Sequence, residues 1–312
     1  MPAEEAGVAP VLFPAPAIGV RRWLSTASAY LQLTKPRIVL LLLITTVPAM
    51  VLAQRGIPSL WLMAATLIGG TASAGGANAI NQYVDRDIDN VMRRTRRRPL
   101  PSGALTPSSA LAFGLILGGA GFLWLAVLVN LLAAALALAA FAFYVLVYTL
   151  WLKRSTSQNI VIGGAAGAAP ALVGWAAVTG RVGMPAAVLF VIVFLWTPPH
   201  FWALAMRYER DYAAAGIPML PVVAGTKVTA RQILWYSLVL VAATLALYPV
   251  ANMGPLYLVI SLVLGAVFIA RAWWLLREGT PRAAMGLFKY SIFYLALLFA
   301  AVAADAIARN GV

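Results

Sequence analysis

The sequence predicts an all-α polytopic membrane protein that crosses the bilayer nine times. Of its 312 residues, 62% are hydrophobic and only 10% are charged, whereas soluble domains average about 25% charged residues. The apolar residues are grouped into stretches close to the roughly 20 residues that a spanning helix needs. The basic residues between these stretches alternate from loop to loop, as expected when cytoplasmic loops collect Lys and Arg.

Nine stretches are long and apolar enough to span. They are 37–54, 58–80, 108–129, 131–151, 159–179, 185–206, 231–251, 255–275 and 287–308.

The distribution of positive charge supports this number. With nine alternating spans, all but three of the 23 Lys and Arg residues fall on one side, the exceptions being Arg55, Arg181 and Arg309. The positive-inside rule then places the N-terminus in the cytoplasm and the C-terminus outside, in a cytoplasmic (inner) membrane of the bacterial type. The net charge of +14 is explained by loops that face lipid headgroups, so we expect a lipid bilayer and no nucleic acid as a partner.

Two regions follow from this map. Residues 1–34 form an Ala- and Pro-rich tail that we expect to be disordered. Within it, 21–34 combine two Arg with Trp23, Leu24, Tyr30 and Leu31, which fits an interfacial helix or an ordinary juxtamembrane anchor. Residues 35–312 form a single transmembrane domain.

An amide and two carboxylates recur at every fourth residue after the second span, at Asn81, Asp85 and Asp89. On an α-helix, such neighbours are offset by only about 40° and rise about 6 Å, so the three form one oxygen-lined stripe. Mg²⁺ is commonly bound by one or two carboxylates together with substrate phosphates. Asp87 lies about 160° round the helix from Asp89 and is expected to pair with a neighbouring Arg instead.

The remaining candidates for polar chemistry lie in the other loops of the basic side. There is no Cys and only one His, so thiolate and multi-histidine metal sites are excluded. Asp211, after the sixth span, is the next candidate metal ligand. Guanidinium and ammonium groups that suit phosphate oxygens are present at Arg94, Arg98, Lys153 and Arg154. Ordinary lipid-facing loops would contain the same residues, so this pattern alone leaves both interpretations open.

The sixth span contains paired prolines next to the single histidine. Pro198 and Pro199 remove backbone donors, which predicts a kink, and His200 follows them directly. A lone His is either a hydrogen-bonded core residue or a substrate contact.

Four further motifs accompany the stripe. They are Arg94-Thr95-x-x-Arg98-Pro99-Leu100-Pro101, Leu152-Lys153-Arg154-x-Thr156-x-x-Asn159, Pro199-His200-Phe201-Trp202-Ala203, and Asp211-Tyr212 leading to Gly216-Ile217-Pro218. Together with the stripe they resemble the UbiA-type intramembrane prenyltransferases, and within them the haem-O synthase (protohaem IX farnesyltransferase) branch, over roughly residues 33–308.

The resemblance implies nine helices around a central cavity and Mg²⁺-dependent transfer of a farnesyl group from farnesyl diphosphate to a vinyl group of haem B. The product, haem O, would serve haem-copper oxidases, with a haem-A synthase or an oxidase assembly factor as a partner. The implied catalytic residues are Asn81, Asp85, Asp89 and Asp211, the last three being metal ligands. The implied diphosphate contacts are Arg94, Arg98, Lys153, Arg154 and Asn159, and the implied haem contact is His200. One departure is that Arg207 stands four residues before Asp211, where other members have a second aspartate.

Two alternatives remain. A related enzyme would prenylate a quinone or another aromatic precursor. A haem carrier or secondary transporter would place ionisable residues near the membrane midplane, whereas the acidic clusters here lie at one edge of the predicted spans.

Overall fold

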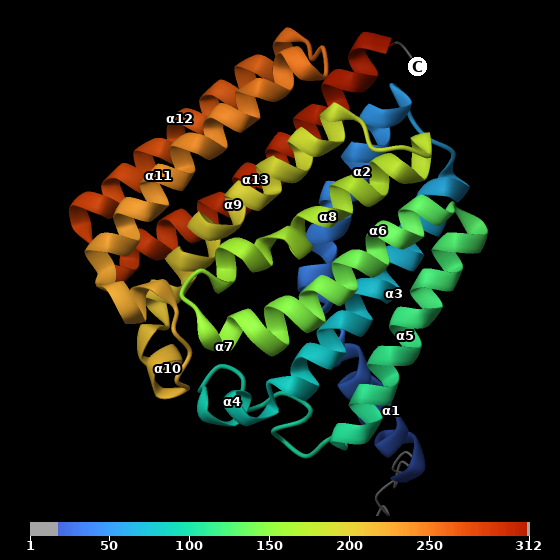
Figure 1. Cartoon of the computed structure of the whole chain (residues 1–312), viewed down its shortest axis with the longest axis vertical. Coiled ribbons are helices and arrows are strands. Elements are labelled where there is room, and N and C mark those ends of the chain that lie inside the picture. The colour runs from blue at the N-terminus through green and yellow to red at the C-terminus, as the bar shows by residue number, and fades with distance from the viewer. Residues whose placement is uncertain (1–17, 311–312) are drawn as a thin grey trace, which may run out of the picture.

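The computed structural model describes residues 18–310, and every regular element within them is helical (Figure 1). The α-helices are α1 (Ile18–Leu33), α2 (Pro36–Gln54), α3 (Leu60–Val84), α4 (Arg86–Val91), α5 (Pro107–Leu128), α6 (Leu131–Ala142), α7 (Lys153–Ser155), α8 (Asn159–Thr179), α9 (Met184–Arg207), α10 (Glu209–Ala214), α11 (Leu220–Val250), α12 (Pro255–Glu278) and α13 (Pro281–Asn310). A π-helix, Phe143–Leu152, joins α6 to α7.

The predicted all-helical membrane architecture is confirmed, and the number of spans is matched in part. Within residues 18–310, eight helices are long and apolar enough to cross a membrane, and α6, the π-helix and α7 form one of them, Leu131–Ser155. The predicted first span, 37–54, corresponds to α2, which runs from Pro36 to Gln54. The ninth span and the orientation of the termini stay predictions.

The helix α9 runs without interruption from Met184 to Arg207 through Pro198 and Pro199, and the kink predicted there stays a prediction. A break that the sequence analysis did not predict occurs in α11, where Gly225 has φ 73° and ψ 172°, a conformation that glycine adopts at no steric cost. The predicted interfacial segment is helical as α1, while the predicted disorder of residues 1–17 lies outside the described residues.

The long helices form a closed ring. Each packs on the next in chain order, from α2 through α3, α5, α6, α8, α9, α11 and α12 to α13, and α13 packs back on α2. Glycines allow the closest approaches: a Cβ on Gly76 of α3 would lie 2.6 Å from the Gly114 carbonyl oxygen of α5. Small residues at such crossings are typical of membrane helices.

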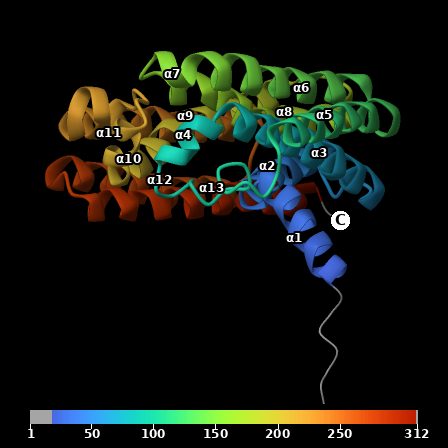
Figure 2. The same cartoon turned by 90° about the horizontal axis from the view of Figure 1, so that it is seen from below.

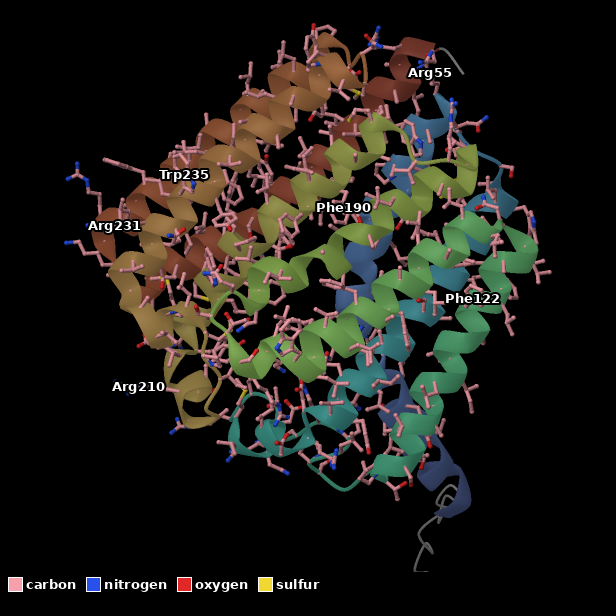
Figure 3. All side chains as sticks on the ribbon, in the orientation of Figure 1. Arg55, Phe122, Phe190, Arg210, Arg231 and Trp235 are labelled. Carbon is pink, nitrogen blue, oxygen red and sulfur yellow. The ribbon has the colours of Figure 1, made fainter. Side chains whose placement is uncertain are left out.

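Three short helices gather at one end of the ring. Figure 1 shows α4, α7 and α10 at its lower end and the C-terminus at the opposite end, and Figure 2 shows α1 extending away from the bundle. Figure 3 places Arg55 at the end opposite Arg210 and Arg231, as the predicted alternation of charge requires. We call the end formed by α4, α7 and α10 the cap end.

Asp305 stabilises the end of the ring opposite the cap end. Its carboxylate, only 2% exposed, accepts the backbone N–H of Gly254 at 2.6 Å and of Tyr257 at 3.1 Å. These groups lie at the start of α12, where backbone donors lack intrahelical partners and negative charge is favourable. This acidic residue therefore fixes the junction of α11, α12 and α13.

Candidate active site

The predicted oxygen-lined stripe lies where α3 ends and α4 begins. The helix axis is interrupted at Asp85, yet the Asp85 N–H still donates to the Asn81 carbonyl at 2.9 Å and the Asp89 N–H to that of Asp85 at 2.8 Å. The register of the stripe therefore survives the junction. Asn81, Asp85 and Asp89 are 3%, 0% and 2% exposed, and the Asn81 amide donates to Asp85 Oδ2 at 2.7 Å.

Each residue of the stripe has its own cationic partner. Lys153 Nζ donates to Asp85 Oδ2, Arg98 Nη1 donates to both oxygens of Asp89 at 2.9 and 2.7 Å, and Lys35 Nζ donates to Asn81 Oδ1 at 2.7 Å. Buried carboxylates need such partners because an isolated buried charge is costly. Arg98 and Lys153 balance the charge of the two carboxylates, and Lys35 adds to the positive charge of the cluster when it is protonated.

Lys35 is a site residue that the sequence did not reveal. In the sequence it is one of the basic residues of the predicted cytoplasmic side, and its partner Asn81 is 46 positions away in the chain. Its backbone is left-handed, with φ 53° and ψ 62°, directly before Pro36, a conformation that costs a non-glycine residue about 1–3 kcal/mol and marks functional sites. Burial, and then the positive charges of Arg98 and Lys153, lower the pKa of Lys35 to about 7.

A cavity of about 350 Å³ extends from this cluster into the ring of helices. Its polar end is lined by Lys35, Asn81, Asp89, Arg94, Arg98 and Lys153. The rest of the wall comes mainly from apolar and small residues of α2, α3, α6, α8 and α9. The cavity is therefore amphipathic, with a charged end at the cap and an apolar interior.

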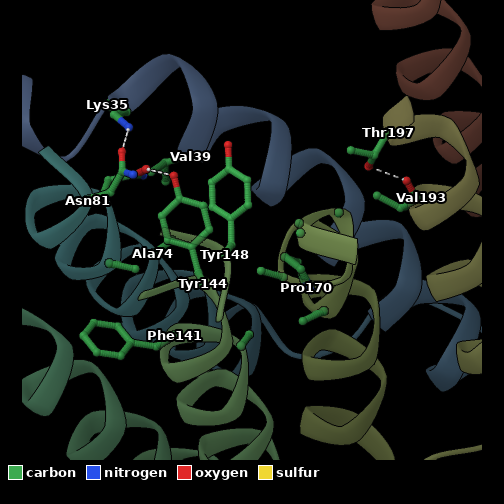
Figure 4. Close-up of a pocket in the computed structure, with 18 of the residues that line it drawn as sticks. Lys35, Val39, Ala74, Asn81, Phe141, Tyr144, Tyr148, Pro170, Val193 and Thr197 are labelled. Carbon is green, nitrogen blue, oxygen red and sulfur yellow. Dashed lines mark hydrogen bonds between the residues drawn. The ribbon is translucent and has the colours of Figure 1, made fainter. Parts of the chain in front are cut away.

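The π-helix places two tyrosines along this wall. Tyr144 and Tyr148 stand side by side with their hydroxyls on the same side (Figure 4), and their ring centroids are 5.3 Å apart. Thr149, in the same π-helix, donates to the Tyr144 carbonyl at 2.8 Å and accepts from the Asn81 amide at 3.1 Å. The apolar sequence of this segment does not predict a π-helix. Such helices are rare and often occur at functional sites.

Arg94 connects the two parts of the cap end. Its Nη2 donates to the Tyr212 hydroxyl at 2.9 Å, and its guanidinium lies 5.6 Å from the ring centroid of Tyr208 and 5.4 Å from that of Tyr212. Tyr208 directly precedes α10, and Tyr212 belongs to α10 and also lines the cavity.

Three predicted site residues do not line the cavity. Arg154 binds Asp87, with both oxygens at 2.7 Å from its Nη atoms, as expected for an Asp87 that faces away from the stripe, and its Nη2 also lies 4.0 Å from Asp85 Oδ1. Asn159 is fully buried and donates to the Thr156 carbonyl at 2.6 Å. Asp211 is half-buried on α10, and none of these three is among the residues that line the cavity.

The donor set of the stripe can be tested against Mg²⁺. Within residues 18–310, no cluster of three or more His, Asp or Glu side chains occurs, so the aspartates do not form an all-protein cage. Asp85 Oδ1 is buried without a hydrogen-bond partner in this part of the chain, with Arg154 Nη2 4.0 Å away. Asp89 lines the cavity, and Asp85 lies directly behind Asn81 and Lys153, which also line it. Two carboxylates, one with an oxygen free of hydrogen bonds, fit a cation that completes its shell with phosphate oxygens and water. The contribution of Asp211 stays a prediction.

His200 lines the cavity farther from the cap end. Its ring stacks on Trp196 with centroids 4.2 Å apart and on Phe288 at 4.6 Å, and its Nδ1 lies 2.7 Å from Ser291 Oγ.

Comparisons with known proteins agree with this geometry. The model of the UbiA prenyltransferase family matches residues 42–301. A protein of Frankia alni named protoheme IX farnesyltransferase is 59% identical over 89% of this chain and 98% of its own length. A protein of the same name from Gloeobacter violaceus is 56% identical over 92% of this chain and 95% of its own.

Solved structures share the fold at low sequence identity. A digeranylgeranylglyceryl phosphate synthase structure has a TM-score of 0.76 at 20% identity and covers 91% of this chain and 99% of its own. A UbiA homologue from Archaeoglobus fulgidus, bound to GPP and Mg²⁺, has a TM-score of 0.62 at 18% identity, covering 88% and 99%. The chain belongs to the UbiA prenyltransferase family.

Proposed function

We propose that this protein transfers a farnesyl group from farnesyl diphosphate to a vinyl group of haem B, and so forms haem O. The observation that carries this function is the 59% identity, over nearly the whole of both chains, to a protein named protoheme IX farnesyltransferase. The amphipathic cavity supports it, because a prenyl diphosphate has an apolar tail and a strongly anionic head.

The charged end of the cavity suits the diphosphate. Arg98 and Lys153 neutralise Asp89 and Asp85, Lys35 binds Asn81, and Arg94 lies at the same end of the cavity. When an anionic ligand enters, these cations can turn from the carboxylates to phosphate oxygens, which frees Asp85 and Asp89. We therefore assign the diphosphate to this set, with Lys35 in place of the predicted Arg154 and Asn159.

Asp85 and Asp89 would hold Mg²⁺ together with the diphosphate, with Asn81 orienting Asp85. Mg²⁺ bound there would act as a Lewis acid that neutralises charge on the departing diphosphate. Preorganised cations from the protein stabilise the same developing charge. The apolar interior holds the farnesyl chain and excludes water from the allylic carbon, whose cationic character grows as its bond to oxygen breaks.

The orientation in the membrane is part of the proposal. With nine spans and the cap end in the cytoplasm, the site opens to the side from which a soluble diphosphate would be supplied. Haem B is the acceptor, and a haem-A synthase or an oxidase assembly factor would receive the product.

The test is the pigment formed by the purified protein. With haem B, farnesyl diphosphate and Mg²⁺, we expect haem O, identified by mass and by its absorption spectrum, together with released diphosphate. Removal of Mg²⁺ should abolish both products. Prenylation of a quinone precursor but not of haem B would favour the first alternative enzyme, and haem movement across vesicles without diphosphate release would favour a carrier.

A further inference from the structure

Two short contacts at Ser291 determine where the proton of His200 lies. Ser291 Oγ lies 2.7 Å from the Phe288 carbonyl oxygen and 2.7 Å from His200 Nδ1. Two oxygens this close need a hydrogen between them, and a carbonyl has none to give. The single hydroxyl proton of Ser291 therefore points to Phe288.

The proton in the second contact must then come from the imidazole. His200 Nδ1–H donates to Ser291 Oγ, which accepts it. The ring is buried, at 7% exposure, and no carboxylate pairs with it among residues 18–310, so the neutral form is favoured over the charged one. In a neutral ring with the proton on Nδ1, Nε2 is the unprotonated nitrogen. Within residues 18–310, Nε2 makes no hydrogen bond, and the protein does not bury this nitrogen completely. Because His200 lines the cavity, its free lone pair is open to that space.

The ring is held in this position from several sides. Trp196 and Phe288 stack on it in nearly parallel orientation, at 20° and 28°, and Phe201 meets it edge-on at 88°. Trp196 Nε1 also donates to the Ser291 carbonyl at 2.7 Å, which fixes α9 to α13 at the residue that orients the imidazole. A neutral imidazole with one nitrogen fixed by a hydrogen bond and the other free is the usual arrangement of a metal-binding histidine.

We propose that His200 Nε2 is the axial ligand of the haem iron, and that Ser291 is a positioning residue that keeps the imidazole in the ligating tautomer. This rests on the proposed function, since haem B enters as the acceptor substrate. His200 lies seven residues before the end of α9 at Arg207, and so about 10 Å deeper than the cap end. An iron held there leaves the edge of the porphyrin to approach the charged end, where the allylic carbon would be.

The experiment is a titration of the full-length protein in detergent with ferric haem B, without farnesyl diphosphate, followed by visible absorption and electron paramagnetic resonance. We expect the wild type to show imidazole-ligated haem. His200→Ala should lose this spectrum, and added imidazole should restore it. Ser291→Ala should raise the Kd for haem about 10-fold, as expected for an outer partner of a metal ligand, whereas Ser291→Thr keeps the hydroxyl and should bind nearly as the wild type.

Ser237→Ala is the matched control. Ser237 is buried in α11, and its hydroxyl donates to the Ile233 carbonyl at 2.6 Å, so the variant loses a similar bond without touching His200. An unchanged ferric-haem spectrum and affinity in His200→Ala would overturn the proposal, as would equal losses in the Ser291→Ala and Ser237→Ala proteins.

Haem O formation is measured separately in the same preparations. If the wild type shows the His200-dependent spectrum but makes no haem O, the ligation stands and the proposed function fails. If it makes haem O while His200→Ala keeps the spectrum, the ligation fails and the function stands. A wild type that binds no haem overturns both.

Discussion

The substitution Asp85→Asn tests the stripe most directly. Asp85 is 0% exposed, its Oδ2 accepts from Asn81 and Lys153, and its Oδ1 has no hydrogen-bond partner among the described residues. Asparagine keeps the shape but removes the charge that would bind Mg²⁺. Loss of one preorganised electrostatic group costs about 2.7–4 kcal/mol of transition-state stabilisation, so we expect the kcat for haem O formation to fall about 100- to 1,000-fold.

Asp87→Asn is the matched control, only two residues away. The Asp87 side chain is 60% exposed and bound by Arg154 at 2.7 Å, on the face away from the stripe. Exposed pairs contribute about 0–1 kcal/mol, so this variant should keep its activity within about 3-fold and its stability within about 1 kcal/mol.

The assay measures initial rates of haem O formation over a series of Mg²⁺ concentrations, with thermal unfolding of each variant by circular dichroism. Asp85→Asn leaves the Lys153 ammonium, whose side chain is only 17% exposed, without its carboxylate, and should lower stability by about 1–3 kcal/mol. Adding Lys153→Gln should restore stability but not activity. Wild-type rates in Asp85→Asn at every Mg²⁺ concentration, or equal losses in the Asp85 and Asp87 variants, would refute the assignment.

Three further substitutions address other parts of the molecule. The pKa of Lys35 is lowered to about 7 from an unfolded value of about 10.4, so between these pH values the unfolded chain binds more protons and the free energy of unfolding should rise with pH. Lys35→Met should abolish that rise and lower kcat/KM about 10-fold, whereas Lys227→Met, at an exposed position, should change neither. Asp305→Asn should set an amide N–H₂ against a buried backbone N–H and cost about 3 kcal/mol in thermal unfolding, with activity kept at low temperature, whereas exposed Glu278→Gln should change neither. Gly76→Ala would put its Cβ 2.6 Å from the Gly114 carbonyl and should destabilise by about 1–3 kcal/mol, whereas Gly119→Ala, with nothing within 4 Å, should be neutral or stabilising.

The sequence alone predicted what depends on spacing along one helix. The apolar stretches predicted the membrane helices, and the four-residue spacing predicted the contact of Asn81 with Asp85. The same geometry put Asp87 on another face, where the structure pairs it with Arg154. These predictions hold because helical periodicity fixes relative direction without knowledge of any other segment.

The remaining features depend on which helices meet across the ring. Lys35 and Asn81 come from separate elements, and the Trp196, His200 and Ser291 cluster joins α9 to α13 over more than 90 positions. Arg94, predicted only as a phosphate contact, also binds Tyr212 across the cap end. Such pairs have no signature in a single sequence, because each residue is ordinary in its own segment and acquires its role from a partner.

Two buried carboxylates at opposite ends of the molecule show how a structural acid differs from a reactive one. Asp305 and Asp85 are both almost completely shielded from water. Both oxygens of Asp305 accept backbone N–H groups of α12, which cannot leave without unfolding the start of that helix. Asp85 is bound instead by the side chains of Asn81 and Lys153, which can turn to another acceptor, and one of its oxygens has no hydrogen-bond partner within residues 18–310. Burial alone therefore does not identify the site. The site is identified by a buried charge whose partners, Asn81 and Lys153, line a cavity and can exchange the carboxylate for a ligand that enters there.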